Sequence, residues 1–254
     1  MNLLEVKNIS KTYGSGETAV KALKNVSFSV PKGEYVAIVG ESGSGKSVSA
    51  KAIMGILAKN GTIDRGQITF SYYRNPEERV TREILQMKKE EIRRHINGKR
   101  IAMVFQDPMT SLNPLMPVGK QIMEGMIWHY HTPKEEAYKK ALELMKLVGI
   151  TDAEKRIKNY PHQLSGGMLQ RIMIGIAMAL QPELLIADEP TTAIDAITQY
   201  EILEEFIRIK KNKNTAMLFI THDLGAISKV ADRILVMNSG HIVDSGNFEH
   251  IRNH

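Results

Sequence analysis

A chain of 254 residues with 43% hydrophobic residues is long enough to bury a full-sized core, and its composition is not that of a disordered protein. Its longest apolar run covers only residues 172–180, far short of the roughly 20 residues that a membrane-spanning helix needs, so we expect no such helix. The first residues alternate like a strand and show no signal peptide, and cysteine is absent. We therefore expect a cytoplasmic protein without disulfides or thiolate-held metal centres.

The net charge of +6 is accompanied by a basic segment, residues 71–100, in which nine Lys and Arg face five Asp and Glu. Such a segment could suit phosphates, nucleic acid or acidic lipid, but the pattern favours a solvated basic helix. Because no zinc-finger spacing, recognition helix or aromatic-interleaved basic strand accompanies this charge, we expect no nucleic-acid partner.

The predicted elements begin with two strands of an antiparallel layer, because residues 4–9 and 26–30 alternate apolar and polar side chains. Compact apolar runs then indicate strands that are buried on both faces of a parallel sheet. These runs are Tyr35–Val39 and residues 101–105, 184–187 and 217–220.

Helical periodicity covers residues 115–161, with Pro133 where a helix would begin. Near the end of the chain, Asn238-Ser239-Gly240 between strand-like residues 233–237 and 241–243 indicates a β-hairpin. Together the elements predict an α/β fold: a mainly parallel sheet core with an N-terminal antiparallel β layer and an inserted helical subdomain.

A phosphate-binding loop is indicated by residues 40–47, which match G-x-x-x-x-G-K-[ST] between the strand Tyr35–Val39 and a helical run at residues 48–57. Its glycines let backbone N–H groups turn towards phosphates, and the following helix adds the positive end of its dipole. Lys46 would reach the β- and γ-phosphates, and the Ser47 hydroxyl would bind Mg²⁺. The nucleotide-binding residues expected here are Gly40, Ser42, Gly43, Ser44, Gly45, Lys46 and Ser47.

This loop predicts a P-loop NTPase (RecA-like) core, but kinases, GTPases and ATPases all cradle phosphates in this way. Two adjacent carboxylates, Asp188 and Glu189, end the strand at residues 184–187 and would meet the ligand crevice of the sheet. Because neighbouring residues of a strand point in opposite directions, Asp188 can serve Mg²⁺ while Glu189 acts as a general base towards water. His222 follows the strand at residues 217–220, where it could contact the γ-phosphate.

A second anion-binding loop is formed by Ser165, Gly166 and Gly167, which precede an almost wholly apolar helix. There they lie where a helix N-terminus offers free N–H groups. This loop, the phosphate loop and the Asp188-Glu189 strand end together resemble the ATP-binding-cassette ATPase family over essentially the whole chain.

The resemblance implies one nucleotide-binding domain over residues 1–254, with a core at 1–106 and 162–254 and a helical subdomain at about 107–161. It implies ATP hydrolysis with ATP and Mg²⁺, in which two ATPase subunits close around two ATP molecules and drive transmembrane permease subunits. In such a pair, residues 165–167 of one chain complete the ATP site of the other.

Further site residues follow from the same resemblance. Tyr13 corresponds to the aromatic residue that stacks on adenine, Gln106 to the glutamine that senses Mg²⁺ and couples to the permease, and His222 to the switch histidine. Residues 192–195 resemble the loop that crosses the dimer interface. Met168 stands where many members have Gln, although this removes no phosphate contact.

Residues 105–114, Phe-Gln-Asp-Pro-Met-Thr-Ser-Leu-Asn-Pro, and residues 165–171 resemble the peptide/nickel importer branch, which takes up oligopeptides, dipeptides, nickel or metal chelates. This implies an extracellular substrate-binding protein in the same system and a peripheral position on the cytoplasmic face of the cell membrane. Members often continue past the position of His254, so we expect a short member or a truncated chain.

Several alternatives remain open from the residues. The transported substrate, and whether the ATPase pair is homo- or heterodimeric, cannot be deduced from them. A soluble cassette ATPase of DNA repair or translation is a second hypothesis, disfavoured because the chain has no long coiled-coil insertion and no second cassette. A P-loop kinase or GTPase is disfavoured by residues 165–167.

Overall fold

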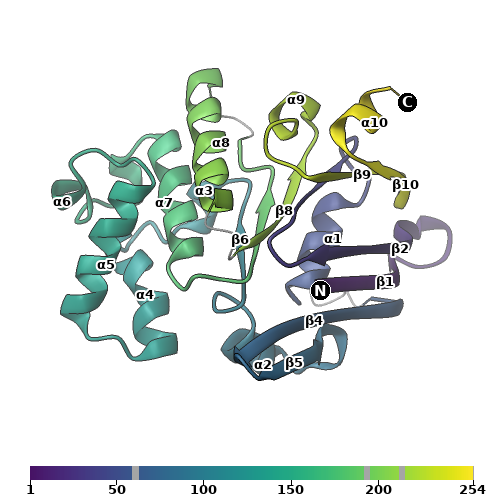
Figure 1. The fold of residues 1–254 in the computed structure, drawn as a ribbon, viewed down its shortest axis with the longest axis horizontal. Helices are drawn as coiled ribbons and strands as arrows, with labels where there is room; N and C mark the ends of the chain where they lie inside the picture. Colours follow the sequence, from purple (N-terminus) through teal and green to yellow (C-terminus); the bar gives the residue numbers. More distant parts are fainter. Residues whose placement is uncertain (59–62, 192–194, 212–214, 254) are drawn as a thin grey trace.

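The computed structural model describes residues 1–58, 63–191, 195–211 and 215–253 (Figure 1). Its strands are β1 (Asn2–Tyr13), β2 (Val20–Pro31), β3 (Tyr35–Val39), β4 (Arg65–Asn75), β5 (Glu78–Glu83), β6 (Ile101–Val104), β7 (Leu184–Asp188), β8 (Ala216–Thr221), β9 (Arg233–Asn238) and β10 (His241–Gly246). Its helices are α1 (Lys46–Ile53), α2 (Lys89–His95), α3 (Pro108–Ser111), α4 (Val118–Tyr130), α5 (Lys134–Leu147), α6 (Ala153–Arg156), α7 (Gly166–Met178), α8 (Ala196–Lys211), α9 (Leu224–Ile227) and α10 (Phe248–Arg252). Short 3₁₀ turns occupy Gly16–Thr18, Ile84–Gln86 and Pro161–Gln163.

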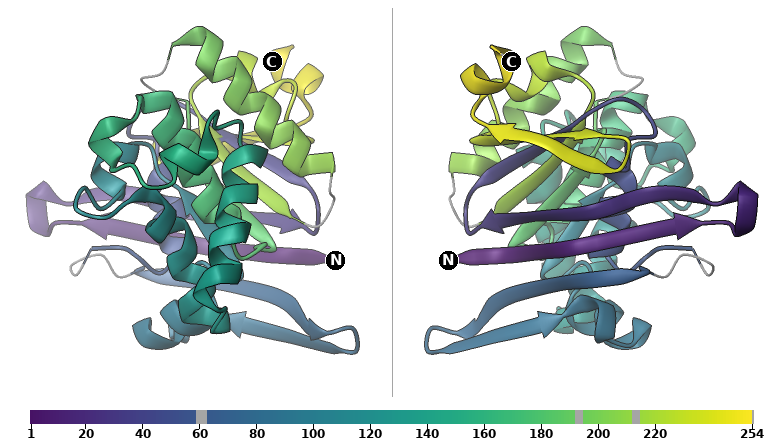
Figure 2. Two further views of the ribbon diagram at one scale, coloured as in Figure 1. Left: turned by 90° about the vertical axis from the view of Figure 1, so that its left-hand side faces the viewer. Right: turned by 90° about the vertical axis from the view of Figure 1, so that its right-hand side faces the viewer.

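The described strands form an antiparallel sheet of order β2-β1-β4-β5 and a larger sheet of order β10-β9-β3-β8-β7-β6. In the larger sheet every pairing is parallel except that of β10 with β9. Figure 1 shows the larger sheet between the helices α4 to α8 and the antiparallel sheet, and Figure 2 shows both sheets from the sides. The predicted α/β fold with an antiparallel layer is confirmed.

The larger sheet separates two hydrophobic cores. All five residues of β3 are buried, and because side chains alternate across a strand they divide between the two faces. Val36 and Ile38 pack with α1 and the antiparallel sheet, whereas Tyr35, Ala37 and Val39 pack with the helices α4, α5, α7 and α8. The carboxyl end of β3, which carries the phosphate loop, is therefore fixed from both sides.

The helices α3 to α6 lie between β6 and α7 in the chain and gather on one side of the larger sheet (Figure 1). The helices α4 and α5 pack on each other and on α7. This arrangement is compatible with the helical subdomain expected at residues 107–161, whose boundaries remain a prediction. No helix among the described residues combines the length and the apolarity needed to span a bilayer.

The predicted basic helix at residues 71–100 is wrong. Most of its first half belongs to β4 and β5, and α2 is a helix of only seven residues. Ile68, Phe70 and Tyr72 are buried at alternate positions of β4, and the Ser71 and Thr81 hydroxyls bond across the two strands at 2.8 Å. Period-two burial of apolar and aromatic side chains favours a strand, and it outweighs the charges, most of which occupy exposed positions.

The remaining expectations differ from the structure mainly at the ends of elements. The strands β1 and β2 are longer than predicted, and α1 begins at Lys46, two residues earlier. The hairpin of β9 and β10 is confirmed, with Ser239 and Gly240 in the left-handed backbone region (φ of 47° and 85°). Two successive positive φ angles match the right-handed twist of hairpin strands.

Candidate functional site

The phosphate loop leads from β3 into α1, in the strand–loop–helix context that its sequence predicts. Two of its glycines are required by close backbone neighbours. A Cβ on Gly40 would lie 2.0 Å from the Met237 carbonyl oxygen, and one on Gly45, whose φ is +106°, would lie 2.6 Å from the Ala22 carbonyl oxygen. The loop is thus held between β9 and β2, where no side chain larger than hydrogen fits.

Lys46 is the first residue of α1 and is only 4% exposed. Its Nζ donates hydrogen bonds of 2.8 Å to the carbonyl oxygens of Gly40 and Glu41, so the ammonium group folds back over the loop. Burial lowers the pKa of Lys46, while the carboxylates of Glu189 and Asp188 oppose that shift. The positive charge is therefore held at the loop, where it would stabilise a bound anion most strongly.

A cavity of about 220 Å³ opens at this loop. It brings together residues that follow three strands, β3, β6 and β7, which are far apart in the sequence. Its lining residues are Ala22, Ser42, Gly43, Gly45, Lys46, Ser47, Val48, Gln106 and Glu189. Ser44 is buried instead, and its hydroxyl has no hydrogen-bond partner among the described residues.

Ser47 and Asp188 lie side by side at the edge of the sheet. The Ser47 Oγ donates a 2.9 Å hydrogen bond to Oδ1 of Asp188, which is buried at the end of β7. Burial raises the pKa of Asp188, the Ser47 hydrogen bond lowers it, and the charge of Glu189 raises it further.

A hydroxyl on the cavity wall paired with a buried carboxylate fits Mg²⁺, which proteins usually hold through one or two carboxylates together with substrate phosphates. The described residues contain no cluster of three or more His, Asp or Glu side chains that would hold a metal by itself. The donor set therefore suits an ion that arrives with a nucleotide.

The Glu189 carboxylate has neighbours from two other loops. The Gln106 Nε2 donates to one of its oxygens at 3.0 Å, and the His222 Nδ1 lies 3.6 Å from the other. The Glu189 backbone has a φ of +46°, and its N–H donates to the Ile220 carbonyl oxygen at 2.8 Å. A non-glycine residue in this region stores strain, which occurs preferentially at functional sites. This backbone turn keeps Glu189 on the cavity wall while Asp188 remains buried.

Tyr13 ends β1 and pairs with Val20 of β2. Two residues further along β2, Ala22 contributes to the cavity wall, so Tyr13 lies on the strand pair that borders the phosphate loop. The Nζ of Lys11 lies 4.5 Å from the centroid of the Tyr13 ring. The adenine-stacking role of Tyr13 remains a prediction.

The second anion-binding loop, residues 165–167, called the signature loop below, does not line this cavity. Ser165 caps α7, and its Oγ accepts a 3.3 Å hydrogen bond from the Met168 N–H. With Gly167 it lines a separate cavity of about 570 Å³ beside α7 and α8. Residues 192–194 of the expected interface loop lie outside the described residues, and Asp195 accepts hydrogen bonds from the Thr198 N–H (3.0 Å) and Oγ1 (2.7 Å).

Some residues around the two cavities could not be predicted from the sequence. Ala22 and Val48 line the phosphate cavity, and no pattern marks them, because they contribute by position and not by side-chain chemistry. Glu201 and Glu205 were also missed: they lie one turn apart on α8 and both face Arg171. An i, i+4 pair of carboxylates was visible in the sequence, but its partner on another helix was not.

Comparison with known proteins identifies the family. A family model described as ABC transporter matches residues 23–192. The dipeptide transport ATP-binding protein DppD of Lactococcus lactis is 48% identical, over 98% of this chain and 69% of its own. The oligopeptide transport ATP-binding protein OppD of Bacillus subtilis is also 48% identical, over 98% of this chain and 67% of its own.

Solved structures agree with this assignment. The dimeric, post-hydrolysis ATP-binding cassette MJ0796 with ADP and Pi has a TM-score of 0.82 and 28% identity, covering 96% of this chain and 98% of that one. CbiO1 of Clostridium perfringens, part of the ABC transporter complex cbiONQ, has a TM-score of 0.78 and 25% identity, covering 100% of this chain and 91% of that one. The P-loop NTPase fold is thereby confirmed, and the chain belongs to the ABC transporter family as one of its ATPases.

Proposed function

We propose that this chain is the ATP-hydrolysing subunit of an importer of peptides. The observation that carries the proposal is the cavity in which the Lys46 ammonium, the Ser47 hydroxyl and the Glu189 carboxylate meet over the phosphate loop. The cargo is inferred from the relatives, which are named for dipeptide and oligopeptide transport. Nickel and metal chelates are the other cargoes that the peptide/nickel importer branch implies.

Nucleotide binding would use the loop and its surroundings. The backbone N–H groups of residues 40–47 and the Lys46 ammonium would hold the β- and γ-phosphates, and Tyr13 would stack on adenine. On binding, Lys46 would exchange its two loop carbonyl partners for phosphate oxygens. Ser47 and Asp188 would hold Mg²⁺ with Gln106 nearby, and this ion would neutralise phosphate charge when bound.

Hydrolysis of ATP to ADP and phosphate would use the Glu189 carboxylate as a general base. It would accept a proton from the water that attacks the γ-phosphorus, and the Gln106 amide would keep the carboxylate on the cavity wall by the bond that it already makes. His222, whose side chain is 59% exposed beside Glu189, could turn towards the γ-phosphate. The roles of these residues are part of the proposal.

The proposed assembly contains two ATPase subunits, identical or different, together with permease subunits and an extracellular substrate-binding protein, at the cytoplasmic face of the membrane. Its support within this chain is that the signature loop lies outside the chain's own phosphate cavity. A helix N-terminus stabilises an anion only within its first turn, so this loop would serve the ATP of a second subunit. We further propose that residues 1–254 form one nucleotide-binding domain, with a core at 1–106 and 162–254.

The alternative, a soluble ATPase of DNA repair or translation, is favoured by no observation. The basic segment at residues 71–100 mostly forms the edge of the antiparallel sheet and the short helix α2.

The proposal is tested in the organism that makes the protein. Removing the chain should abolish uptake of labelled di- or oligopeptides, and wild-type chain, but not the Glu189→Gln variant, should restore it. The tagged chain should purify from membranes with permease subunits and a peptide-binding protein. Normal peptide uptake without the chain would refute the assignment of peptides as its cargo. Purification of the tagged chain with nucleic acid in place of membrane proteins would refute the transporter role.

A further inference from the structure

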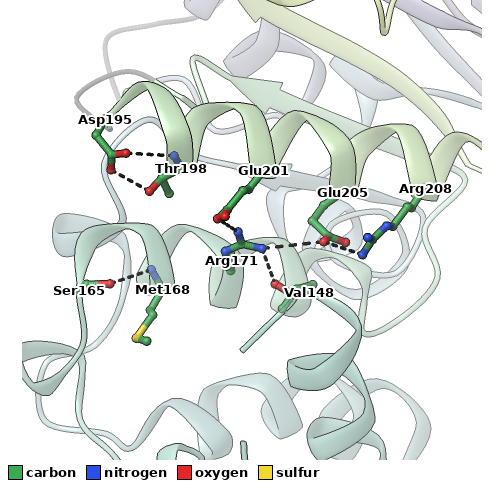
Figure 3. A network of polar contacts seen from close by, with 9 residues as sticks. All are labelled: Val148, Ser165, Met168, Arg171, Asp195, Thr198, Glu201, Glu205 and Arg208. Carbon is green, nitrogen blue, oxygen red and sulfur yellow. Dashed lines mark hydrogen bonds and ion pairs between the residues drawn. The ribbon is translucent and has the colours of Figure 1, made fainter. Parts of the chain in front are cut away.

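The helices α7 and α8 contact each other at two levels, the second of which is drawn in Figure 3. The first level is at their amino ends, where Gly167 meets Thr198: a Cβ on Gly167 would lie 2.6 Å from the Thr198 Cγ2. The signature loop thus packs against the first turn of α8.

The second level is Arg171, one turn further along α7 and buried. Its Nη2 donates to the Glu201 carboxylate, and its Nη1 lies 3.8 Å from the Glu205 Oε1. The same Nη1 donates a 3.0 Å hydrogen bond to the Val148 carbonyl oxygen at the end of α5. Figure 3 shows this guanidinium between the two helices, so one side chain connects α5, α7 and α8.

The surroundings of Arg171 are shaped for a guanidinium group. Val148 is the C-cap of α5, where carbonyl oxygens lack helical partners and the helix dipole attracts a cation. Gly149 follows with a φ of +74°, and a Cβ there would lie 2.7 Å from the Arg171 Nη1. A planar fork can reach acceptors on two sides at once, which the single ammonium of a lysine cannot do with the same geometry.

The polar contacts of Arg171 are directional, whereas the other contacts of α7 are mainly apolar. The helix is almost wholly apolar and packs on α4 and α5, and hydrophobic contact has no preferred direction. Charge-assisted hydrogen bonds are directional and can fix the rotation and height of α7 against α8. Arg171 lines the cavity beside α7 and α8 and not the phosphate cavity, so any effect on hydrolysis passes through the placement of α7.

We infer that Arg171 is a positioning residue for ATP hydrolysis. Through Glu201 and Glu205 it sets the signature loop, residues 165–167, in a fixed relation to α8, so that its N–H groups meet the γ-phosphate held by the opposite subunit. This inference rests on the proposed function, in which the signature loop completes the partner's ATP site.

The test compares Arg171→Gln, Arg171→Lys, Glu201→Gln and the double variant Arg171→Gln/Glu201→Gln in the assembled transporter. Arg208→Gln is the matched control, because Arg208 pairs with Glu205 from the solvent side (3.0 Å, 61% exposed) and, among the described residues, makes no hydrogen bond or ion pair with α7. For each variant, the turnover number at saturating MgATP, the ATP affinity and the melting temperature are measured.

Arg171→Gln should lower turnover by on the order of 10²-fold, as misplacement of a catalytic contact by about 1 Å does, with ATP affinity unchanged. Arg171→Lys should recover only part of the loss. The double variant should lose no more than Arg171→Gln alone, because the two residues act through one contact. Arg208→Gln should hydrolyse ATP like the wild type.

Glu201→Gln keeps the inference testable if the Arg171 variants do not fold, because the Glu201 side chain is 53% exposed and its loss does not threaten the core. Wild-type turnover in Glu201→Gln, or losses that simply add in the double variant, would overturn the inference. Gly166→Asp distinguishes a failure of the proposed function from a failure of the positioning role. If it leaves hydrolysis intact, the proposed role of the signature loop is wrong; if it blocks hydrolysis while the Arg171 and Glu201 variants are normal, only the positioning role is wrong.

Discussion

The Ser47 hydroxyl donates a 2.9 Å hydrogen bond to the Asp188 carboxylate, although 141 residues separate the two in the chain. The bond exists because β3 and β7 both run parallel to β8, which lies between them, and therefore end at the same edge of the sheet. A hydroxyl and a carboxylate brought together in this way, next to a phosphate loop, are the two protein donors that a nucleotide-bound Mg²⁺ would need.

Asp188→Asn should stabilise the nucleotide-free protein at neutral pH. Burial raises the pKa of Asp188, so the folded state holds its proton more tightly than the unfolded state, and stability falls as pH rises through the carboxyl range. The gain in melting temperature should therefore be largest at neutral pH and vanish in acid. Each 1 kcal/mol relieved corresponds to about 2–4 °C for a chain of this size. An equal gain at acid and neutral pH, measured by thermal unfolding, would contradict the charge argument, and the variant should also lose the Mg²⁺ dependence of ATP binding.

Lys46→Ala should weaken ATP binding, because it removes the buried ammonium group from the phosphate loop. Hydrogen bonds of charged groups contribute about 1.5–3 kcal/mol, which corresponds to roughly 10- to 100-fold in affinity. Equilibrium titration with a fluorescent ATP analogue measures the change. Lys51→Ala is the control, since Lys51 is an exposed lysine of the same helix. Unchanged ATP affinity in Lys46→Ala would show that Lys46 does not bind the phosphates.

Glu189→Gln should retain ATP binding and lose hydrolysis. The amide cannot accept the proton of the attacking water, so turnover should fall by roughly the 10²–10⁴-fold of a positioned general base. Single-turnover hydrolysis in the assembled transporter is the measurement, with Glu249→Gln on α10 as a control remote from the cavity. A turnover near that of the wild type would show that another group takes the proton.

Tyr13→Ala should lower ATP affinity modestly and leave turnover at saturating ATP in place. An aromatic stacking contact contributes about 0.5–1.5 kcal/mol beyond its buried area. Tyr13→Phe keeps the ring and should bind ATP like the wild type. Tyr13→Ala should lower the affinity for GTP as much as that for ATP, because stacking does not involve the hydrogen-bonding groups that distinguish the two bases. Equal ATP affinities of the Ala variant and the wild type, compared by titration, would refute the stacking role.

The two glycines of the signature loop should differ in their tolerance of a methyl group. Among the described residues, a Cβ on Gly166 would have no neighbouring atom within 4 Å, whereas one on Gly167 would lie 2.6 Å from the Thr198 Cγ2. Gly167→Ala should therefore destabilise the folded chain by about 1–3 kcal/mol, the usual cost of overpacking, and Gly166→Ala should not. Thr198→Ser removes Cγ2 but keeps the hydroxyl that bonds Asp195, so it should restore the melting temperature of Gly167→Ala. Equal melting temperatures of the two alanine variants would disprove this close contact.

The phosphate loop and the Asp188-Glu189 strand end could be predicted from the sequence, because their chemistry is local. In this kind of loop the backbone N–H groups that surround a phosphate belong to consecutive residues, so the spacing of Gly40, Gly45 and Lys46 is enough to predict the site. The buried strands were predictable for a similar reason, since a run such as Tyr35–Val39 with no polar residue has to be covered on both faces.

The charges of residues 71–100 led to the wrong prediction of a helix, because charged side chains are compatible with any exposed backbone conformation. The alternate burial of Ile68, Phe70 and Tyr72, which marks the strand, depends on β1 lying alongside. The Arg171 network depends on tertiary structure in the same way. Arg171 and Glu201 are 30 residues apart, and nothing local distinguishes this pair from any other arginine and glutamate on two helices. Their ion pair forms because the tertiary structure places α8 beside α7, so the packing of the elements decides which of these charges come together.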